Sequence, residues 1–235
     1  PGLYQESGMD YPDNLERFGY FSRAVVQLLL VLNRRWGWKS AVIHLHDWQA
    51  ALCAVYLKSV YRAYPELVGV RSVLTLHNIG YQGVFPGSEY WKVGLPDALF
   101  SISSLEYYGS VNLLKGGIVF ADFLTTVSPT YSRDIQSSEF GFGLEGVLSE
   151  RRAFLRGIVN GIDTEVWNPA TDPFLESHYS ISALNGKKQC KIHLQREVEL
   201  DKSDSLLIGV IARLTLQKRL DLLVEIVPEL MESGL

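Results

Sequence analysis

The pattern of hydrophobic and polar positions along the chain predicts strands that alternate with helices. Helices are expected where apolar residues recur with the helical period, and strands where short apolar runs lie between turn signals. The predicted strands cover residues 41–46, 71–77, 123–128, 155–159 and 206–212. The predicted helices cover residues 14–36, 48–64, 111–121, 144–152 and 183–199, and two more begin at Pro129 and near Lys218. This alternation is typical of an α/β fold with a parallel sheet and helices on both of its faces.

Local signals predict where some of these elements begin and where the chain divides. Asp13 is a plausible N-cap of the first helix. Ser128 is the expected N-cap of the helix that begins at Pro129, since proline is well tolerated at the first helical position, whose N–H has no helical partner. The aromatic and glycine-rich loop over residues 78–94 is long for a compact domain, which favours a functional role. The loop-rich stretch over residues 162–182 is the expected domain boundary.

Polar residues stand at or just after the ends of the predicted strands. In open α/β sheets, ligands bind at the edge where the carboxyl ends of the strands meet. We therefore expect a ligand site at that edge, formed by His46-Asp47, His77-Asn78, Ser128, Asn160-Gly161 and Arg213.

The histidines at the end of the first predicted strand, and Asp47 after it, allow other interpretations. His44 and His46 share one face of a strand and, together with Asp47, could chelate a metal, but no third His or Cys stands at ligand spacing. The alternative is that His44 is a buried histidine with its hydrogen bonds satisfied. Asp47 begins a predicted helix, so it is an N-cap, a ligand-binding residue, or both.

The glycine motifs do not indicate a dinucleotide or phosphate loop. Gly141, Gly143 and Gly146 match the GxGxxG pattern of NAD-binding folds, but a polar stretch precedes them where that motif requires a strand. We interpret them as a flexible loop that opens a helix. The segment Lys115-Gly116-Gly117 lacks the Ser or Thr of a phosphate loop, and close helix packing explains it better.

Two further groups of residues suggest binding. Arg213 and Lys218 flank a turn from a strand to a helix, where cations and free helix N–H groups can surround one anion; two exposed surface cations are the alternative. Aromatic residues in the loop over 78–94 can stack on sugar rings or simply pack the loop down: Tyr81, Phe85, Tyr90 and Trp91.

Composition narrows the class of protein. The 235 residues include 22 Lys plus Arg against 26 Asp plus Glu, a net charge of −4, which argues against a nucleic-acid partner. The longest apolar run, residues 24–32, falls short of the roughly 20 residues of a membrane span. Cys53 and Cys190 form no disulfide framework or metal motif, which fits a reducing compartment. Because Pro1 opens the chain without Met or a signal segment, we expect an internal piece of a longer protein.

Six segments, in order along almost the whole chain, resemble bacterial glycogen synthases and plant starch synthases. They are HLHDWQAAL (44–52), LTLHNIGYQGVF (74–85), LKGGIVFADFLTTVSPTYSRDIQ (114–136), GFGLEGVL (141–148), IVNGIDTEVWNPATD (158–172) and VIARLTLQKRLDLL (210–223). The resemblance implies a GT-B fold, in which two Rossmann-like parallel-sheet domains face each other across a cleft. Residues 1–161 would be the N-terminal starch-synthase catalytic domain, truncated at its start, and residues 162–235 the linker and the start of the C-terminal glycosyltransferase domain.

The resemblance also implies a reaction and its partners. A retaining glycosyltransferase of this family moves glucose from ADP-glucose or UDP-glucose to the non-reducing end of an α-1,4-glucan, without a cofactor or a metal. We expect ADP-glucose as the donor, glycogen or starch as the acceptor, and no nucleic-acid or membrane partner. A bacterial cytoplasm is expected rather than a plastid.

The positions that match the family's motifs indicate which residues of this chain belong to the site. The resemblance implies His77, Asp47 and Asn160 as catalytic residues, with His77 contacting the donor glucose. It implies Arg213, Lys218, Asn160 and Gly161 as donor-binding residues, the two cations holding the diphosphate. The expected acceptor-binding residues are Tyr11, Asp13, Asn14, Trp48 and Tyr81.

The chain also departs from the family pattern. The family's lysine-containing glycine motif and its acidic second-domain motif are absent, and Arg219 stands where the family usually has glycine. We therefore expect the fragment alone to be inactive. A non-catalytic glucan-binding fragment or homologue is the alternative, and an NAD-dependent oxidoreductase is a third interpretation, which requires a strand directly before Gly141.

Overall fold

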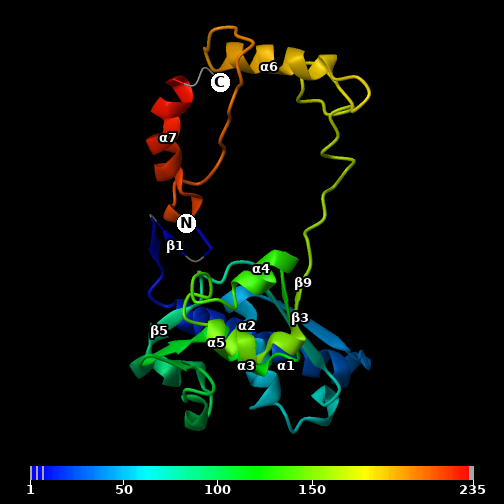
Figure 1. Ribbon diagram of the computed structural model, residues 1–235. Helices are drawn as coiled ribbons and strands as arrows, with labels where there is room; N and C mark the ends of the chain where they lie inside the picture. Colours follow the sequence, from blue (N-terminus) through cyan, green and yellow to red (C-terminus); the bar gives the residue numbers. More distant parts are fainter. Residues whose placement is uncertain (1, 4, 7, 233–235) are drawn as a thin grey trace. The chain divides into compact units, whose positions relative to one another are not determined.

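The fold is seen in a computed structural model that describes residues 2–3, 5–6 and 8–232. The chain divides into two compact units, Pro1–Asn160 and Gly161–Leu235 (Figure 1). The first unit contains the larger sheet and the helices that pack on it. Among the described helices, none is both long and apolar enough to cross a membrane.

A parallel four-stranded sheet forms the centre of the first unit. Its strands are β3 (Val42–His46), β4 (Arg71–Leu76), β8 (Phe123–Thr126) and β9 (Leu155–Gly157), in the order β3-β4-β8-β9. All three pairings are parallel, so the carboxyl ends of the strands meet at one edge. Four predicted strands and the parallel α/β arrangement are thus confirmed.

The helices of the first unit follow the predicted pattern, with some changes at their ends. They are α1 (Asn14–Trp36), α2 (Asp47–Lys58), α3 (Leu113–Phe120), α4 (Pro129–Asp134) and α5 (Glu145–Glu150). Helix α1 has the predicted bounds and ends at Gly37, whose left-handed conformation suits glycine. Helix α2 ends six residues earlier than predicted: the Ser59 hydroxyl donates to the Val55 carbonyl, and a short 3-10 helix, η1 (Pro65–Leu67), follows.

Two predicted N-caps have different outcomes. The Ser128 hydroxyl accepts a hydrogen bond from the Tyr131 N–H over 3.0 Å, so this cap is confirmed. Asp13 occupies the N-cap position of α1, but its side chain makes no capping hydrogen bond, and only its carbonyl accepts the first helical bond, from Arg17. Asp13 is thus the N-cap residue, as predicted, but it caps the helix without a side-chain hydrogen bond.

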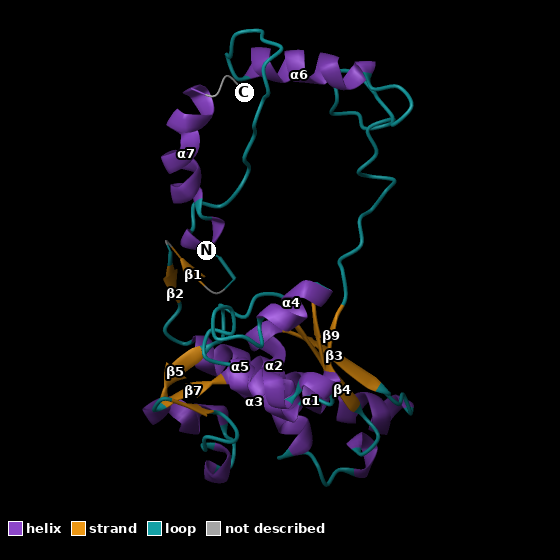
Figure 2. Ribbon diagram, viewed as in Figure 1, coloured by secondary structure: helices purple, strands orange, loops and turns teal. Residues whose placement is uncertain are grey.

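The core lies between the sheet and the layer of helices beside it (Figure 2). Helices α2 and α3 approach closely because Gly116 and Gly117 have no side chains: a Cβ on Gly117 would lie 2.6 Å from that of Ala51, and one on Gly116 would lie 3.2 Å from Val55 Cγ2. Lys115 is buried and donates from Nζ to the carbonyls of Ile102 and Glu106. The interpretation of this segment as close helix packing is confirmed.

The opposite face of the sheet is open in the described part of the chain. Ile43 and Leu45 of β3 are buried, whereas Val42 is 55% exposed. By register, Val42, His44 and His46 share their face with Phe123 of β8, which is 51% exposed. Helices were predicted on both faces, and the described residues cover one of them.

Residues 84–112, which include most of the predicted loop over residues 78–94, contain regular structure that the pattern did not predict. Strands β5 (Val84–Pro86), β7 (Ser110–Asn112) and β6 (Glu106–Tyr107) form a small antiparallel sheet in the order β5-β7-β6. The first unit also contains the 3-10 helices η2 (Gly87–Val93), η3 (Asp97–Leu99) and η4 (Arg152–Phe154). Near the start of the chain, β1 (Gln5–Glu6) pairs with β2 (Met9–Asp10).

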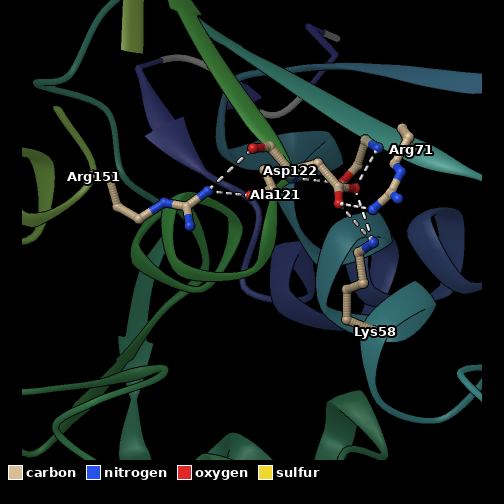
Figure 3. A network of polar contacts seen from close by, with 6 residues as sticks. Lys58, Arg71, Ala121, Asp122 and Arg151 are labelled. Carbon is tan, nitrogen blue, oxygen red and sulfur yellow. Dashed lines mark hydrogen bonds and ion pairs between the residues drawn. The ribbon is translucent and has the colours of Figure 1, made fainter. Parts of the chain in front are cut away.

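An ionic network ties the amino edge of the large sheet together (Figure 3). The Asp122 carboxylate lies 2.9 Å from Lys58 Nζ and 3.1 Å from Arg71 Nη1, and it accepts bonds from the N–H and hydroxyl of Ser72. Burial acts to raise the pKa of Asp122, but these donors outweigh it and lower the pKa to about 2. Arg151 donates to the carbonyls of Ala121 and Asp122 from the other side.

The second unit contains α6 (Asn185–Glu197), η5 (Leu216–Lys218) and α7 (Leu220–Glu232). Both helices agree with predictions, within a few residues. The strand predicted over residues 206–212 does not form: these residues have no regular structure, and Ile211 is fully exposed. A strand is stabilised by hydrogen bonds to a neighbouring strand, and the described residues of this unit supply no partner for it.

Candidate functional site

The carboxyl edge of the large sheet brings together three of the predicted polar residues. Strand β3 ends at His46, β4 ends directly before His77, and the two strands pair in parallel with His46 opposite Thr75. Asp47 follows His46 without any connecting loop and begins α2. The predicted cluster of polar side chains at this edge is therefore present for His46, Asp47 and His77.

Asp47 connects the two strand ends. Its Oδ1 accepts a hydrogen bond from the main-chain N–H of His77 over 2.8 Å. Its φ is 53°, a left-handed conformation that costs energy for a residue with a Cβ but that Asp tolerates better than most. The N-cap position of α2 is His46, and no side chain caps this helix start. The interpretation of Asp47 as an N-cap is thus wrong, because its carboxylate is used on His77.

Three histidine rings line the same edge. His46 Nδ1 lies 3.0 Å from His77 Nε2, and the rings of His44 and His46 have centroids 4.3 Å apart. Burial lowers the pKa of His46, and the neighbouring His44 and His77 lower it further. His44 was interpreted as a buried histidine; it is exposed, although its Nε2 lies 2.7 Å from the Thr75 hydroxyl.

The metal interpretation finds no support at this edge. Among the residues that the structure describes, no group of three or more His, Cys, Asp or Glu side chains is arranged to hold a metal ion. His44 is instead hydrogen-bonded to Thr75, and the Asp47 carboxylate to a main-chain N–H. The arrangement suits hydrogen bonding to a polar ligand.

The turn after His77 is anchored to α4. The Asn78 side chain accepts the N–H of Gly80 over 3.0 Å, and the Ile79 N–H donates to the Tyr131 hydroxyl over 3.1 Å. Ser128 begins α4 and thereby places Tyr131 there. Burial raises the pKa of Tyr131, so its hydroxyl stays protonated at neutral pH. Tyr131 lies within a segment that resembles the family but was not predicted as a site residue, since its position depends on the packing of α4.

A pocket of about 610 Å³ adjoins the histidine rings. Its lining combines apolar side chains of α1 with the polar residues of the sheet edge. The lining residues are Leu3, Arg17, Phe18, Phe21, His44, His46, Asp47, Gln49 and Ala50.

Trp48 and Tyr81, both predicted to bind the acceptor, differ in exposure. Trp48 is only 8% exposed. Its ring packs edge-on against Phe18, with ring centroids 4.7 Å apart, and at a tilt against Phe85, with centroids 5.9 Å apart. It also fills the space beside Gly83, where a Cβ would lie 2.4 Å from the indole. Tyr81 is 49% exposed. The described geometry thus leaves the Tyr81 ring accessible and encloses that of Trp48.

The other predicted acceptor residues lie before and at the start of α1. The Tyr11 hydroxyl donates to the Gly2 carbonyl over 3.2 Å, and the Arg17 guanidinium stacks 4.8 Å from the Tyr11 ring. Asn14 is buried and accepts from Arg17 Nη1 over 2.9 Å, whereas Asp13 is exposed. Arg17 therefore connects Tyr11 and Asn14 to the pocket.

The predicted donor-binding residues lie at the boundary between the two units and in the second unit. Asn160 is exposed and follows the end of β9 by three residues; it closes the first unit, and Gly161 opens the second. Arg213 and Lys218 belong to the second unit and are both exposed. The Lys218 N–H donates to the Thr215 carbonyl, and the Thr215 N–H donates to that of Arg213, so the chain turns between the two cations.

The glycine motif at 141–146 has none of the context of a dinucleotide site. The NAD interpretation requires a strand directly before Gly141, but residues 135–139 form turns and no strand. The NAD interpretation is therefore not supported. Gly143 has a φ of +82° and lies against the Tyr107 hydroxyl, which donates to the Phe142 carbonyl. Gly141 and Gly143 thus belong to a turn that leads into α5, as predicted, and Gly146 lies within that helix. The prediction that this turn is flexible does not fit the close packing of Gly143 against Tyr107.

Comparison with known proteins places this geometry in a family. A family model described as the starch synthase catalytic domain matches residues 1–150. Glycogen synthase 2 of Geobacter sulfurreducens is 47% identical over 99% of this chain and 48% of its own length. The glycogen synthase of Thermodesulfovibrio yellowstonii is 42% identical over 99% of this chain and 46% of its own.

A solved structure agrees with these relatives. The catalytic domain of starch synthase IV from Arabidopsis thaliana, bound to ADP and acarbose, is 37% identical and superposes with a TM-score of 0.82. The similarity covers 96% of this chain and 46% of that chain. The chain thus spans about half the length of the curated relatives it matches, and its fold is of the predicted α/β GT-B type. On this sequence and structural similarity, the chain belongs to the starch synthase catalytic domain family.

Proposed function

We propose that the complete protein transfers glucose from ADP-glucose to the non-reducing end of an α-1,4-glucan, with retention of configuration. The observation that carries this proposal is the anchored His77 at the carboxyl edge of the sheet, in a chain of the starch synthase family. The starch synthase neighbour is bound to ADP and acarbose, which supports an adenine nucleotide donor and a glucan acceptor. UDP-glucose is the competing donor.

His77 is the residue that we assign to the donor glucose. Its main chain is fixed by Asp47 and its ring lies beside His46, so a sugar hydroxyl would meet a histidine of defined orientation. Asp47 then supports the reaction by positioning His77. Asn160 and Gly161 are also assigned to donor binding, and this assignment rests on their matching motif.

Arg213 and Lys218 are assigned to the diphosphate. Departure of a nucleoside diphosphate leaves an oxocarbenium-like sugar and places negative charge on the leaving group. Two cations aimed at that charge lower the barrier electrostatically, and no side chain has to act as a covalent nucleophile. The exposed positions of both side chains are compatible with ligand contact.

The acceptor side is assigned to residues around the pocket and the Tyr81 loop. Tyr81 offers an exposed ring for stacking on a glucose unit. Tyr11, Asp13 and Asn14 flank Arg17, which lines the pocket. Trp48 acts indirectly in this assignment: its buried ring packs against Gly83, two residues after Tyr81, and so supports the loop that carries Tyr81.

We further propose that residues 1–161 are the truncated N-terminal catalytic domain and residues 162–235 the linker and the start of the C-terminal domain. The family match over residues 1–150 and the boundary between the two compact units support this division. The isolated chain should then be inactive. The bacterial origin of the glycogen synthases named above supports a bacterial cytoplasm over a plastid, which cell fractionation would test.

The test is release of ADP or UDP by the intact gene product, incubated with glycogen and either ADP-glucose or UDP-glucose. We expect release from ADP-glucose, and its loss in His77→Ala. His178→Ala, which alters an exposed histidine outside the candidate site, should keep wild-type turnover. A folded protein that binds glucan but releases neither diphosphate would support the non-catalytic alternative.

A further inference from the structure

His46 contacts the ring of His77 directly. The Nδ1 of His46 lies 3.0 Å from the Nε2 of His77, and the two rings stack with an interplanar angle of 30° and centroids 5.2 Å apart. Both side chains are exposed, so burial in the core does not force this contact. It occupies one of the two nitrogens through which His77 can bind a ligand.

A chain of side-chain contacts holds His46 from the opposite side. The His44 ring lies 4.3 Å from that of His46, and His44 Nε2 is 2.7 Å from the Thr75 hydroxyl. Thr75 in turn shares a 2.6 Å hydrogen bond with Thr125. Because paired residues of parallel strands point to the same side, these residues of β3, β4 and β8 lie on one face of the sheet. The chain of contacts ends at the His77 ring.

The protonation state of His46 makes the contact directional. Partial burial, together with His44 and His77, lowers the pKa of His46 and favours the neutral imidazole. A neutral imidazole has one N–H and one acceptor nitrogen. Whichever of these the Nδ1 of His46 presents, the Nε2 of His77 must supply the complement, and in a neutral ring the Nδ1 of His77 then takes the opposite role.

We propose that His46 is a positioning residue for His77, which sets the ring orientation and the tautomer that His77 presents to the donor sugar. This inference rests on the proposed function and adds a role that His77 and Asp47 do not fill. Asp47 fixes the main chain of His77, whereas the ring still rotates about two side-chain bonds. His46 restrains that rotation.

Two variants of His46 separate the effect of its hydrogen bond to His77 from the effect of its side-chain size. His46→Leu removes the nitrogen but keeps a side chain of similar size. His46→Asn places an amide close to the position of Nδ1 and can restore the hydrogen bond. His193→Leu is the matched control, since His193 belongs to α6 of the second unit and its ring nitrogens lie 3.8 Å from Glu176 and 3.9 Å from Glu197.

Two measurements on the complete protein are needed. The first is ¹⁵N NMR of labelled histidine rings without substrate, with the His77 signals assigned by their loss in His77→Gln; it reports the tautomer independently of activity. The second is steady-state kinetics with ADP-glucose and glycogen. In His46→Leu we expect changed His77 signals and a kcat lowered roughly 10- to 100-fold, the range seen when an orienting partner of a histidine ligand is removed. We expect a smaller rise in the KM for the donor, and His46→Asn should restore both the signals and kcat.

The outcomes distinguish this inference from the proposed function. Unchanged His77 signals in His46→Leu would overturn the positioning role, whatever the activity. Changed signals with an unchanged kcat would also overturn it, while leaving the proposed function intact. An inactive wild-type protein would instead reject the proposed function, and any catalytic role of His46 with it.

Discussion

The carboxylate of Asp47 accepts the main-chain N–H of His77 over 2.8 Å, and so joins the first residue of α2 to the residue that follows β4. The two residues are 30 positions apart in the sequence. Asp47 makes this bond with a φ of 53°, a conformation that costs roughly 1–2 kcal/mol for a residue with a Cβ. A conformation that costs energy and places a carboxylate on the main chain of His77, the residue proposed to contact the donor sugar, is the kind of local strain that is common at functional sites.

Substitutions at Asp47 should separate this strain from the hydrogen bond. Asp47→Asn keeps an acceptor oxygen and a residue type that tolerates positive φ, so we expect a modest loss of kcat. Asp47→Ala loses the bond and keeps the strain, and should lower both kcat and the melting temperature. Asp47→Gly relieves the strain but loses the bond. If Asp47→Gly keeps full turnover with a raised melting temperature, the bond to His77 is unimportant for catalysis.

Gly83 should tolerate no side chain, because Trp48 occupies the space. Gly83→Ala places a Cβ 2.4 Å from the indole and adds the cost of a φ of +62°. Gly109→Ala is the control, with a φ of +80° and open space around its Cβ. We expect about 1 kcal/mol of destabilisation in Gly109→Ala from backbone strain alone. Gly83→Ala should cost roughly 1–3 kcal/mol more from overpacking, measured by urea denaturation. Equal losses would show that Trp48 moves aside freely.

Asp122 should stabilise the fold at neutral pH and lose this effect in acid. Its folded-state pKa of about 2 lies below the ordinary value of 3.8, so the stabilisation is present above pH 4 and disappears as the pH falls towards 2. The shift corresponds to about 2 kcal/mol. Asp122→Asn should therefore lower the free energy of unfolding near pH 7 and approach the wild type near pH 2.5. Glu139→Gln, at an exposed position, should show no such dependence.

The two cysteines should differ in reactivity. Burial raises the pKa of the Cys53 thiol to about 11, so almost no thiolate forms at pH 8, and the side chain is inaccessible. Cys190 is partly exposed and donates to the Ser177 carbonyl. Peptide mass spectrometry after iodoacetamide labelling at pH 8 should find Cys190 modified in the native protein and Cys53 only after unfolding. Rapid labelling of Cys53 in the native state would contradict its burial.

The elements of the first unit could be predicted from the sequence because their apolar patterns are strong. Strands β3, β4 and β8 are short apolar runs between turn signals, and α1 has apolar residues at helical spacing throughout. The small sheet of β5, β7 and β6 was missed, since strands of two or three residues have no measurable period. The strand over 206–212 was predicted from its apolar run, but strand formation also depends on a neighbour, which the pattern does not contain.

The position of the site could be predicted, but its internal contacts could not. Strand ends identified His46, Asp47 and His77 as neighbours, because parallel strands end at one edge. The partner of the Asp47 carboxylate, the exposure of His44 and the burial of Trp48 depend on register and packing between elements distant in the sequence. For the same reason the roles of Tyr131 and Thr75 were not predicted.

The absence of a loop between β3 and α2 has a mechanical consequence. His46 is the last residue of the strand and Asp47 the first of the helix, so the joint has no spare residue to absorb movement. A displacement of α2 along its axis would pull the Asp47 carboxylate away from the His77 N–H or would carry His77 with it. The position of His77 is therefore coupled to that of α2, and the packing of α2 against α1 and α3 sets that position.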